Sequence, residues 1–398
     1  MNTSALKFRD FRIYLGGNVL ALNALWMQRV TIGWLAWDMT NSASFVGLVS
    51  FINFLPTVVA GPLFGVWVDR LNVKNAALVT QTTQLIIGII LYACFGLGVL
   101  GPVVLCVVSG LSGVVAAAHN PIRMSLAPRL VPKDDVASVV NFVAINFNLA
   151  RMTGPALGGW IIAIWGVGTS LILQVVFFVP FIVALSVLTP RDRQTPLEPA
   201  GSFLSSLSIG LRHAWDVPLI RHAMMLTGCF AFVSRGTLEL MPVIADGVFQ
   251  RGAGGLGLLT SAAGGGAVLA GLGKMMMQSQ TPGRLPKPAM LSSIIGAALV
   301  PVLAFSTSWS VTVFLAGCLG FLGTFNGISM QTAIQIELDD HLRGRVMSLW
   351  VMVAIGATAS GAMLMGLLAD LVGMVPAMAG MGLTALAFIG LLLIRIWD

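Results

Sequence analysis

A chain of 398 residues with 57% hydrophobic and only 9% charged residues is not an ordinary soluble protein, because charged residues make up about a quarter of that class. Long runs without Asp, Glu, Lys or Arg exclude that class as well. These runs are 39–68, 75–122, 152–190, 252–273, 288–336, 346–369 and 371–394. Since a membrane-spanning helix needs roughly 20 apolar residues, each of the longest runs holds two spans. The sequence therefore predicts a polytopic membrane protein in a lipid bilayer.

The spans are predicted to be helices, because the apolar runs are long and do not alternate with polar residues as barrel strands do. A net charge of +7 would suit a nucleic-acid-binding protein, but the distribution of the charge argues against nucleic acid as a partner. With twelve spans and a cytoplasmic N-terminus, 18 of the 22 basic residues fall at or near the cytoplasmic face. We therefore expect an all-α membrane protein with both termini in the cytoplasm.

In chain order, the predicted helices are separated by short turns and charged loops. Those of the first half cover about 11–37, 45–68, 76–98, 102–126 and 136–164, and a sixth ends near 188. A long polar linker rich in proline and charge follows. Those of the second half cover about 219–244 and 256–277, with two more in 288–336 and two after the loop 339–345. The predicted domains are a six-helix bundle over 1–188, a cytoplasmic linker over 189–217 and a second six-helix bundle over 218–398.

The two halves resemble each other when they are shifted by 206 positions. Asn120, Ile122, Met124, Ala127 and Asp134 then stand opposite Asn326, Ile328, Met330, Ala333 and Asp340. These identities fall at the same boundary between a span and a loop, and the same shift places Arg29 opposite Arg235. The pattern predicts two parallel repeats, with a substrate site between them near the midplane of the membrane.

A charged segment lies between the second and third predicted helices. Gly65, Asp69, Arg70 and Lys74 have the spacing G-x-x-x-D-R-x-x-x-K, which resembles the corresponding loop of the major facilitator superfamily. In that family the Asp interacts with the N-terminus of helix eleven. The resemblance implies a conformational latch on the inner side that favours the outward-open state. The alternative is a solvated loop whose charges only set the topology.

The latch residues that this resemblance implies are Gly65, Asp69, Arg70, Lys74, Arg343 and Arg345. Two positions depart from the family pattern, because Asn72 replaces a second Gly and Val73 replaces a basic residue. The corresponding segment of the second half, 271–274, lacks the Asp. Only a latch in the first half is therefore predicted.

The fifth predicted helix contains Gly154, Pro155, Gly158 and Gly159 in the order Gly-Pro-x-x-Gly-Gly. This order is similar to the antiporter signature of the same superfamily, which marks exporters that exchange cargo for protons. Glycines let helices approach closely, and proline removes a backbone hydrogen bond so that the helix bends. The alternative is ordinary glycine-mediated packing, which occurs in many transmembrane helices.

Charged residues inside the spans mark a functional site, because each is costly in hydrocarbon and must face protein or water. The candidates are Arg29, Arg151, Arg235 and Glu239. The predicted cavity residues are Asn18, Trp26, Gln28, Arg29, Arg151 and Arg235. Three arginines against one acid favour anionic or polar cargo over a bare cation. Alternatively, the arginines bind carbonyl groups at helix breaks.

Glu239 is the only acid well inside a span, and we expect it to bind and release protons together with Arg235. The two residues are one helical turn apart and are able to pair. A static pair that only stabilises the seventh helix is the alternative. The superfamily's common Arg in the apolar part of helix four is missing from 106–118, which shifts the predicted coupling to Glu239.

No pattern of catalytic, nucleotide-binding or metal-binding residues competes with this interpretation. The chain lacks G-x-x-x-x-G-K-[ST], and no His and carboxylate cluster indicates a metal. We therefore predict neither an enzyme nor a cofactor. The driving force is expected to be an ion gradient or the gradient of the cargo itself.

Further segments, 34–42 and 342–348, resemble the drug and siderophore exporter branch of the superfamily, which includes the enterobactin exporter and the transmembrane secretion effectors. This resemblance covers nearly the whole chain. It implies a monomeric, proton-coupled exporter of small amphipathic molecules that works by alternating access. An uptake transporter or a lipid flippase of the same fold is one alternative, and a membrane receptor or scaffold without transport is another.

Overall fold

The computed structural model describes residues 4–68, 72–191, 203–275 and 283–397. This part of the chain is built from helices and contains no strand, which confirms the predicted all-α class. The first half holds α1 (Arg9–Thr40), α2 (Ala43–Val68), α3 (Val73–Gly96), α4 (Pro102–Leu126) and α5 (Val136–Val187), with short 3-10 turns at η1 (Ser4–Lys7), η2 (Ala127–Leu130) and η3 (Lys133–Asp135). The observed bounds of α1 to α4 agree with the predicted ones to within a turn.

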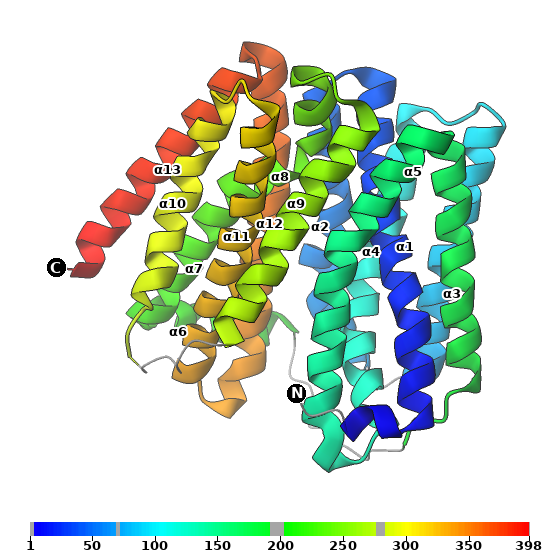
Figure 1. Ribbon diagram of the computed structural model, residues 1–398. Coiled ribbons are helices and arrows are strands. Elements are labelled where there is room, and N and C mark those ends of the chain that lie inside the picture. Colours follow the sequence, from blue (N-terminus) through cyan, green and yellow to red (C-terminus); the bar gives the residue numbers. More distant parts are fainter. Residues whose placement is uncertain (1–3, 69–71, 192–202, 276–282, 398) are drawn as a thin grey trace.

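The long helix α5 contains two spans that meet at a sharp break. Gly166 has a φ of 82° and a ψ of 170° there. This conformation is essentially restricted to glycine, because a Cβ would collide with the backbone. The break reverses the chain direction, so α5 runs through the first half twice (Figure 1).

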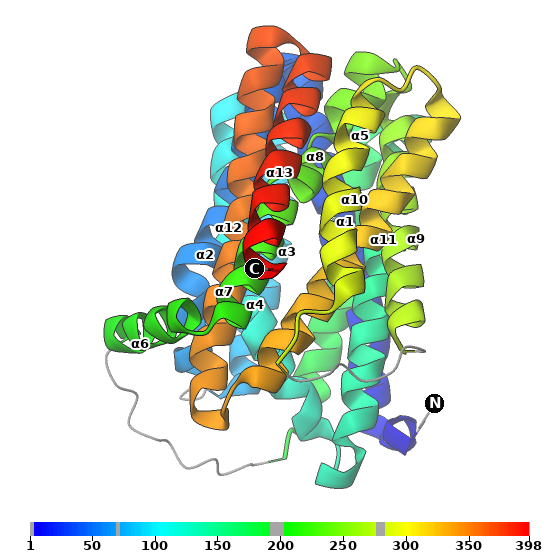
Figure 2. The ribbon, with the colours of Figure 1, turned by 90° about the vertical axis from the view of Figure 1, so that its left-hand side faces the viewer.

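The second half begins with a helix that the sequence interpretation missed. This half holds α6 (Phe203–Asp216), α7 (Pro218–Phe230), η4 (Ala231–Arg235), α8 (Gly236–Glu239), η5 (Val243–Val248), α9 (Gly252–Met275), α10 (Lys287–Ala304), α11 (Trp309–Glu337), α12 (Asp340–Val372) and α13 (Met374–Trp397). The chain bends by 103° between α6 and the span that follows it. Figure 2 shows α6 extending sideways from the bundle.

Helix α6 occupies the end of the stretch that we expected to be a polar linker, so that expectation was incomplete. Its small residues Gly210 and Ala214 face α12, and a Cβ on Gly210 would lie 3.2 Å from Leu349. Tertiary packing therefore stabilises a segment whose serines and charges suggested a linker. The expected loop 339–345 is also largely helical, since α12 already begins at Asp340.

Among the described residues, nine helices are long and apolar enough to cross a membrane, or ten if α6 and the bent span after it are counted as one. One of the nine, α5, holds two spans. A further helix, α1, has 32 residues and carries charges near both ends. This arrangement is consistent with the twelve predicted spans.

The two halves pack side by side as bundles of steeply inclined helices, joined mainly by α2 against α12 and by α5 against α9 (Figures 1 and 2). We call the end of the molecule that carries the N-terminus the inner end and the opposite end the outer end. Small residues bring the halves together: Gly159 meets Gly257, and Gly47 meets the carbonyl of Ala362. Because both approaches lie in the outer half of the helices, the molecule is closed at its outer end.

Candidate functional site

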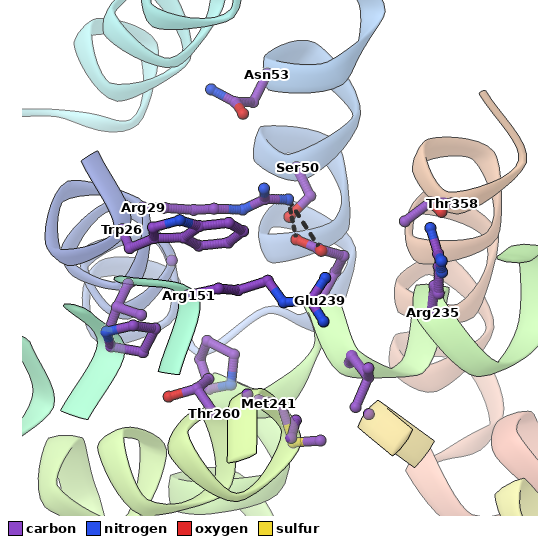
Figure 3. A pocket seen from close by; sticks show the side chains of 18 of the residues that line it. Trp26, Arg29, Ser50, Asn53, Arg151, Arg235, Glu239, Met241, Thr260 and Thr358 are labelled. Atoms are coloured by element: carbon purple, nitrogen blue, oxygen red, sulfur yellow. Dashed lines mark hydrogen bonds and ion pairs between the residues drawn. The ribbon is translucent and has the colours of Figure 1, made fainter. Parts of the chain in front are cut away.

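A cavity of about 290 Å³ lies between the two halves (Figure 3). Its walls come from α1, α2, α4 and α5 of the first half and from η4, α8, α9, α11 and α12 of the second half. All four charges predicted inside the spans line it, namely Arg29, Arg151, Arg235 and Glu239. Trp26 and Pro155 line it too. The structure thus brings together predicted residues that are more than 200 positions apart in the chain.

An ion pair crosses this cavity from one half to the other. Nη2 of Arg29 on α1 donates hydrogen bonds to both carboxylate oxygens of Glu239 on α8, each at 3.0 Å. The guanidinium also lies over the rings of Phe54, at 4.3 Å, and Trp26, at 5.5 Å, where it gains cation–π attraction. The two side chains are 32% and 20% exposed, so cargo and water from the cavity are able to reach the pair.

Arg151 and Arg235 converge on two consecutive residues of α11. Nη2 of Arg151 donates to Oγ1 of Thr324 at 2.6 Å, which is a second link between the halves. Nη2 of Arg235 donates to the carbonyl of Gly323 at 2.8 Å. Both acceptors are neutral groups. Because a single carboxylate faces three guanidinium groups, the residues that line the cavity carry a net positive charge.

The pairing expected between Arg235 and Glu239 is wrong, because Glu239 pairs with Arg29 instead. The seventh span is a π-helix over Ala231–Arg235 and an α-helix over Gly236–Glu239. From this span Arg235 reaches the carbonyl of Gly323 on α11, whereas Glu239 reaches Arg29 on α1.

Two residues expected in the cavity lie elsewhere, inside the first half. Asn18 is buried where α5 covers α1, and its Oδ1 accepts a hydrogen bond of 3.0 Å from Asn146. Gln28 is also buried, and its Oε1 accepts a hydrogen bond from Gln84 on α3. Arg29 faces the second half, so the preceding residue points into the first bundle.

The glycines of the antiporter-like segment pack α5 against two neighbours. Gly154 and Gly158 lie against α1, where a Cβ on Gly154 would be 2.5 Å from the Cβ of Trp26. Gly159 lies against Gly257 on α9 of the second half. The segment therefore contacts both the cavity wall and the interface between the halves.

Of the expected latch, Asp69 and Arg70 lie outside the described residues, and Gly65 lies in α2. Lys74 has a different role from the one expected. Its Nζ donates hydrogen bonds of 2.7 Å to the carbonyls of Ser186 and Leu188. A cation that binds the free carbonyls at the C-terminus of a helix stabilises that end, so Lys74 connects α3 to α5 within the first half.

Both expected basic partners of the latch lie near the beginning of α12. Arg343 is exposed, and Arg345 is half-buried beside Gly210 of α6.

Two residues that contact the charged side chains of the cavity, Phe54 and Thr324, were not predicted. They are common residue types in spans, and no spacing pattern singles them out.

Solved structures of membrane transporters have the same fold. The nucleoside transporter NupG matches with a TM-score of 0.73 at 14% identity, over 98% of this chain and 99% of that chain. A bacterial homologue of the human lysosomal transporter Spinster, in an inward-facing and occupied conformation, matches with a TM-score of 0.69 at 14% identity, over 97% of each chain.

Curated relatives match over nearly the whole chain. The enterobactin exporter EntS of Shigella dysenteriae is 27% identical over 100% of this chain and 94% of its own length. The staphyloferrin A transporter of Staphylococcus aureus is 22% identical over 95% of this chain and 92% of its own length. The multidrug efflux pump Tap of Mycobacterium tuberculosis is 26% identical over 87% of this chain and 83% of its own length.

The model of one protein family, described as transmembrane secretion effector, matches residues 2–397. That match covers both bundles and the cavity between them. Together with the fold, it identifies a multi-pass membrane transporter and not an enzyme. The chain therefore belongs to the transmembrane secretion effector family of the major facilitator superfamily.

Proposed function

We propose that this transporter exports oxygen-rich amphipathic molecules, such as siderophores, in exchange for protons. The observation that carries the proposal is the ion pair between Arg29 and Glu239, which joins the two halves inside a cavity with two further arginines. Relatives named as an enterobactin exporter and a staphyloferrin A transporter support cargo of this class.

The cargo would satisfy two kinds of group in the cavity. Its carbonyl or carboxyl oxygens would accept hydrogen bonds from Arg151 and Arg235, which now donate to neutral oxygens of the protein. Its hydroxyl groups would donate to the carboxylate of Glu239. Apolar parts of the cargo would contact Trp26 and Phe54, which already form a wall beside Arg29.

Protons and such cargo would compete for Glu239. A deprotonated carboxylate accepts hydrogen bonds from Arg29 and from a cargo hydroxyl, whereas a protonated one loses its charge and most of that attraction. Binding of a proton from the outside would then release cargo there. Loss of the proton to the cytoplasm would prepare the cavity for the next cargo molecule.

The same geometry provides for a second candidate function, uptake by proton symport. A simple anion without hydroxyl donors would bind Arg29 best when Glu239 is protonated, because a charged Glu239 repels it and occupies Arg29. Proton and anion would then move in the same direction. The direction of cargo-driven proton movement therefore separates export by exchange from uptake.

We further propose that the protein is a monomer in the bacterial inner membrane with both termini in the cytoplasm, a proposal supported by the basic residues at the inner end. Labelling of single cysteines in intact cells tests this orientation. A cysteine that replaces exposed Arg9 or Arg284 should react with a membrane-impermeant thiol reagent only after the membrane is made permeable. A cysteine that replaces exposed Leu97 should react in intact cells.

The test of coupling is proton flux in proteoliposomes with a hydroxylated siderophore-like cargo. We expect Glu239→Gln to abolish cargo-dependent proton flux while cargo still equilibrates down its own gradient, because the amide no longer titrates. Glu337→Gln is the matched control, since Glu337 lies at the inner end of α11 and accepts a hydrogen bond from the backbone of Gly283 there. Retention of gradient-driven accumulation by the Glu239 variant contradicts the proposal.

A further inference from the structure

The N-terminus of α2 lies at the outer end of the molecule, and its free backbone donors are shared between the two halves. The first N–H groups of any helix have no partner within the helix. Here Ser42 is the N-cap, because its Oγ accepts a hydrogen bond of 3.1 Å from the backbone of Phe45. This local cap leaves the backbone N–H groups of Ala43 and Ser44 without a partner on their own side.

Asp370 of the other half accepts both of these donors. Its Oδ1 binds the N–H of Ala43 at 2.8 Å, and its Oδ2 binds the N–H of Ser44 at 2.9 Å. The hydroxyls of Ser42 and Ser44 also donate to Oδ2, at 2.6 and 2.5 Å. Asp370 lies in the last turn of α12. One carboxylate therefore accepts four hydrogen bonds from the opposite bundle, at the positive end of the α2 dipole.

The packing of α12 against α2 makes this cap possible. Gly366, one turn before Asp370, lies directly against the carbonyl of Ala43, and Gly47 lies against the carbonyl of Ala362. A Cβ at either glycine would collide with the opposite backbone. Because the two helices touch here, the short side chain of Asp370 is long enough to reach the first turn of α2.

A second carboxylate joins the halves at the same end. Oδ2 of Asp246, on η5, accepts a hydrogen bond of 2.9 Å from Nε1 of Trp37 on α1. Oδ1 of Asp246 binds the backbone N–H of Gly252, at the start of α9, at 3.2 Å. Asp246 thus ties the outer ends of α1 and α9 together, and its contact with Trp37 is independent of α2 and α12.

We infer that Asp370 is a gating residue of the transport cycle: it caps α2 of the opposite half while the outer end is closed and releases it when the outer end opens. The inference rests on transport by alternating access and not on the chemistry of the cavity. Separation of the bundles must break all four hydrogen bonds of Asp370, and water then replaces them. The cap therefore shifts the balance between the two conformations without locking either.

The test is the distance between two spin labels on cargo-free protein whose four native cysteines have been replaced. Leu97→Cys and Phe305→Cys place the labels at exposed positions on the outer ends of different halves. We expect Asp370→Ala to raise the ratio of the outward-open to the outer-closed population about tenfold, and Ser44→Ala to raise it less. Asp38→Ala, an exposed carboxylate at the same end, is the control and should leave the ratio unchanged.

An Asp370→Ala distance distribution identical to that of the parent protein, with Asp38→Ala also unchanged, overturns the gating role. If the alanine variant does not fold, Asp370→Asn removes the charge at constant size and should shift the ratio in the same direction. Glu239 is intact in every variant compared, and neither cargo nor a proton gradient is present, so the comparison does not test the proposed coupling. Failure of the gate is therefore distinguishable from failure of the proposed coupling.

Discussion

The role of a charged residue in the cavity depends more on the group that it contacts than on its own residue type. Arg29, Arg151 and Arg235 are all guanidinium groups inside spans, yet one binds a carboxylate, one a hydroxyl and one a carbonyl. Of these three arginines, Arg29 alone pairs with a carboxylate, and its guanidinium also lies over two aromatic rings. We therefore expect the largest effect on transport from this arginine.

Arg29→Ala should lower the rate of cargo transport in proteoliposomes by at least about tenfold, because removing one partner of an interfacial charge pair costs on the order of 2 kcal/mol. Arg29→Lys should recover part of the loss, since lysine keeps the charge but not the planar group that stacks on Phe54. Arg251, which stacks on Trp309 at the outer end, provides the control. Equal rates for Arg29→Ala and Arg251→Ala would rule out this role.

At the scale of elements, breaks in helices set the course of the chain around the cavity. The break at Gly166 turns α5 back on itself, and the π turn of η4 lies directly before Arg235 and Glu239. The 103° bend after α6 directs that helix away from the span that follows. The sequence already placed the ends of predicted spans close to two of these breaks, at 164 and 219, but it carried no signal for the π turn.

Gly166→Ala should destabilise the protein by about 1–3 kcal/mol, because a φ of 82° with a ψ of 170° is a conformation that only glycine adopts readily. The measurement is the thermal unfolding temperature in detergent. Gly16→Ala is the matched control, since a Cβ there has open space and the position is inside a helix. The control should be neutral or slightly stabilising. An unchanged unfolding temperature for Gly166→Ala contradicts the assignment of strain to this position.

For the whole molecule, the helix pair α2 and α12 combines one observed carboxylate contact with one that the sequence predicts. Asp370 binds α2 at the outer end, and the sequence predicts that Asp69, beyond the described part of α2, interacts with α12 at the inner end. Two such contacts at opposite ends of one helix pair would favour opposite conformations. Alternating access would then follow from their competition.

The double variant tests this competition. Asp69→Asn should lower the ratio of outward-open to outer-closed populations, and Asp370→Asn should raise it. If Asp69 forms its predicted contact at the inner end, the two effects should add, so the double variant returns toward the parent ratio. The same pair of outer spin labels reports all three variants. A double variant that resembles either single variant would show that the two contacts do not compete.

The sequence predicted the fold well, because a spanning helix in lipid needs a long apolar run and little else. It also identified Arg29, Arg151, Arg235 and Glu239, since charges are costly in such runs and stand out. Gly154, Pro155, Gly158 and Gly159 stood out by their order. No comparable pattern marked Phe54, Thr324 or Asp370, because a residue type that is common in spans or at their ends becomes functional only through its neighbours.

The class of protein, the two repeated bundles and the charges that a transport cavity needs were all predictable from the amino-acid order. Which charge pairs with which became clear only in the folded molecule. Glu239 binds Arg29 of the opposite half, and Asp370 caps a helix more than 300 positions away in the chain. The physical reason is that hydropathy is a local property of the chain. The partner of a buried charge, in contrast, depends on helix rotation, on breaks in the backbone and on the close approach that glycines permit.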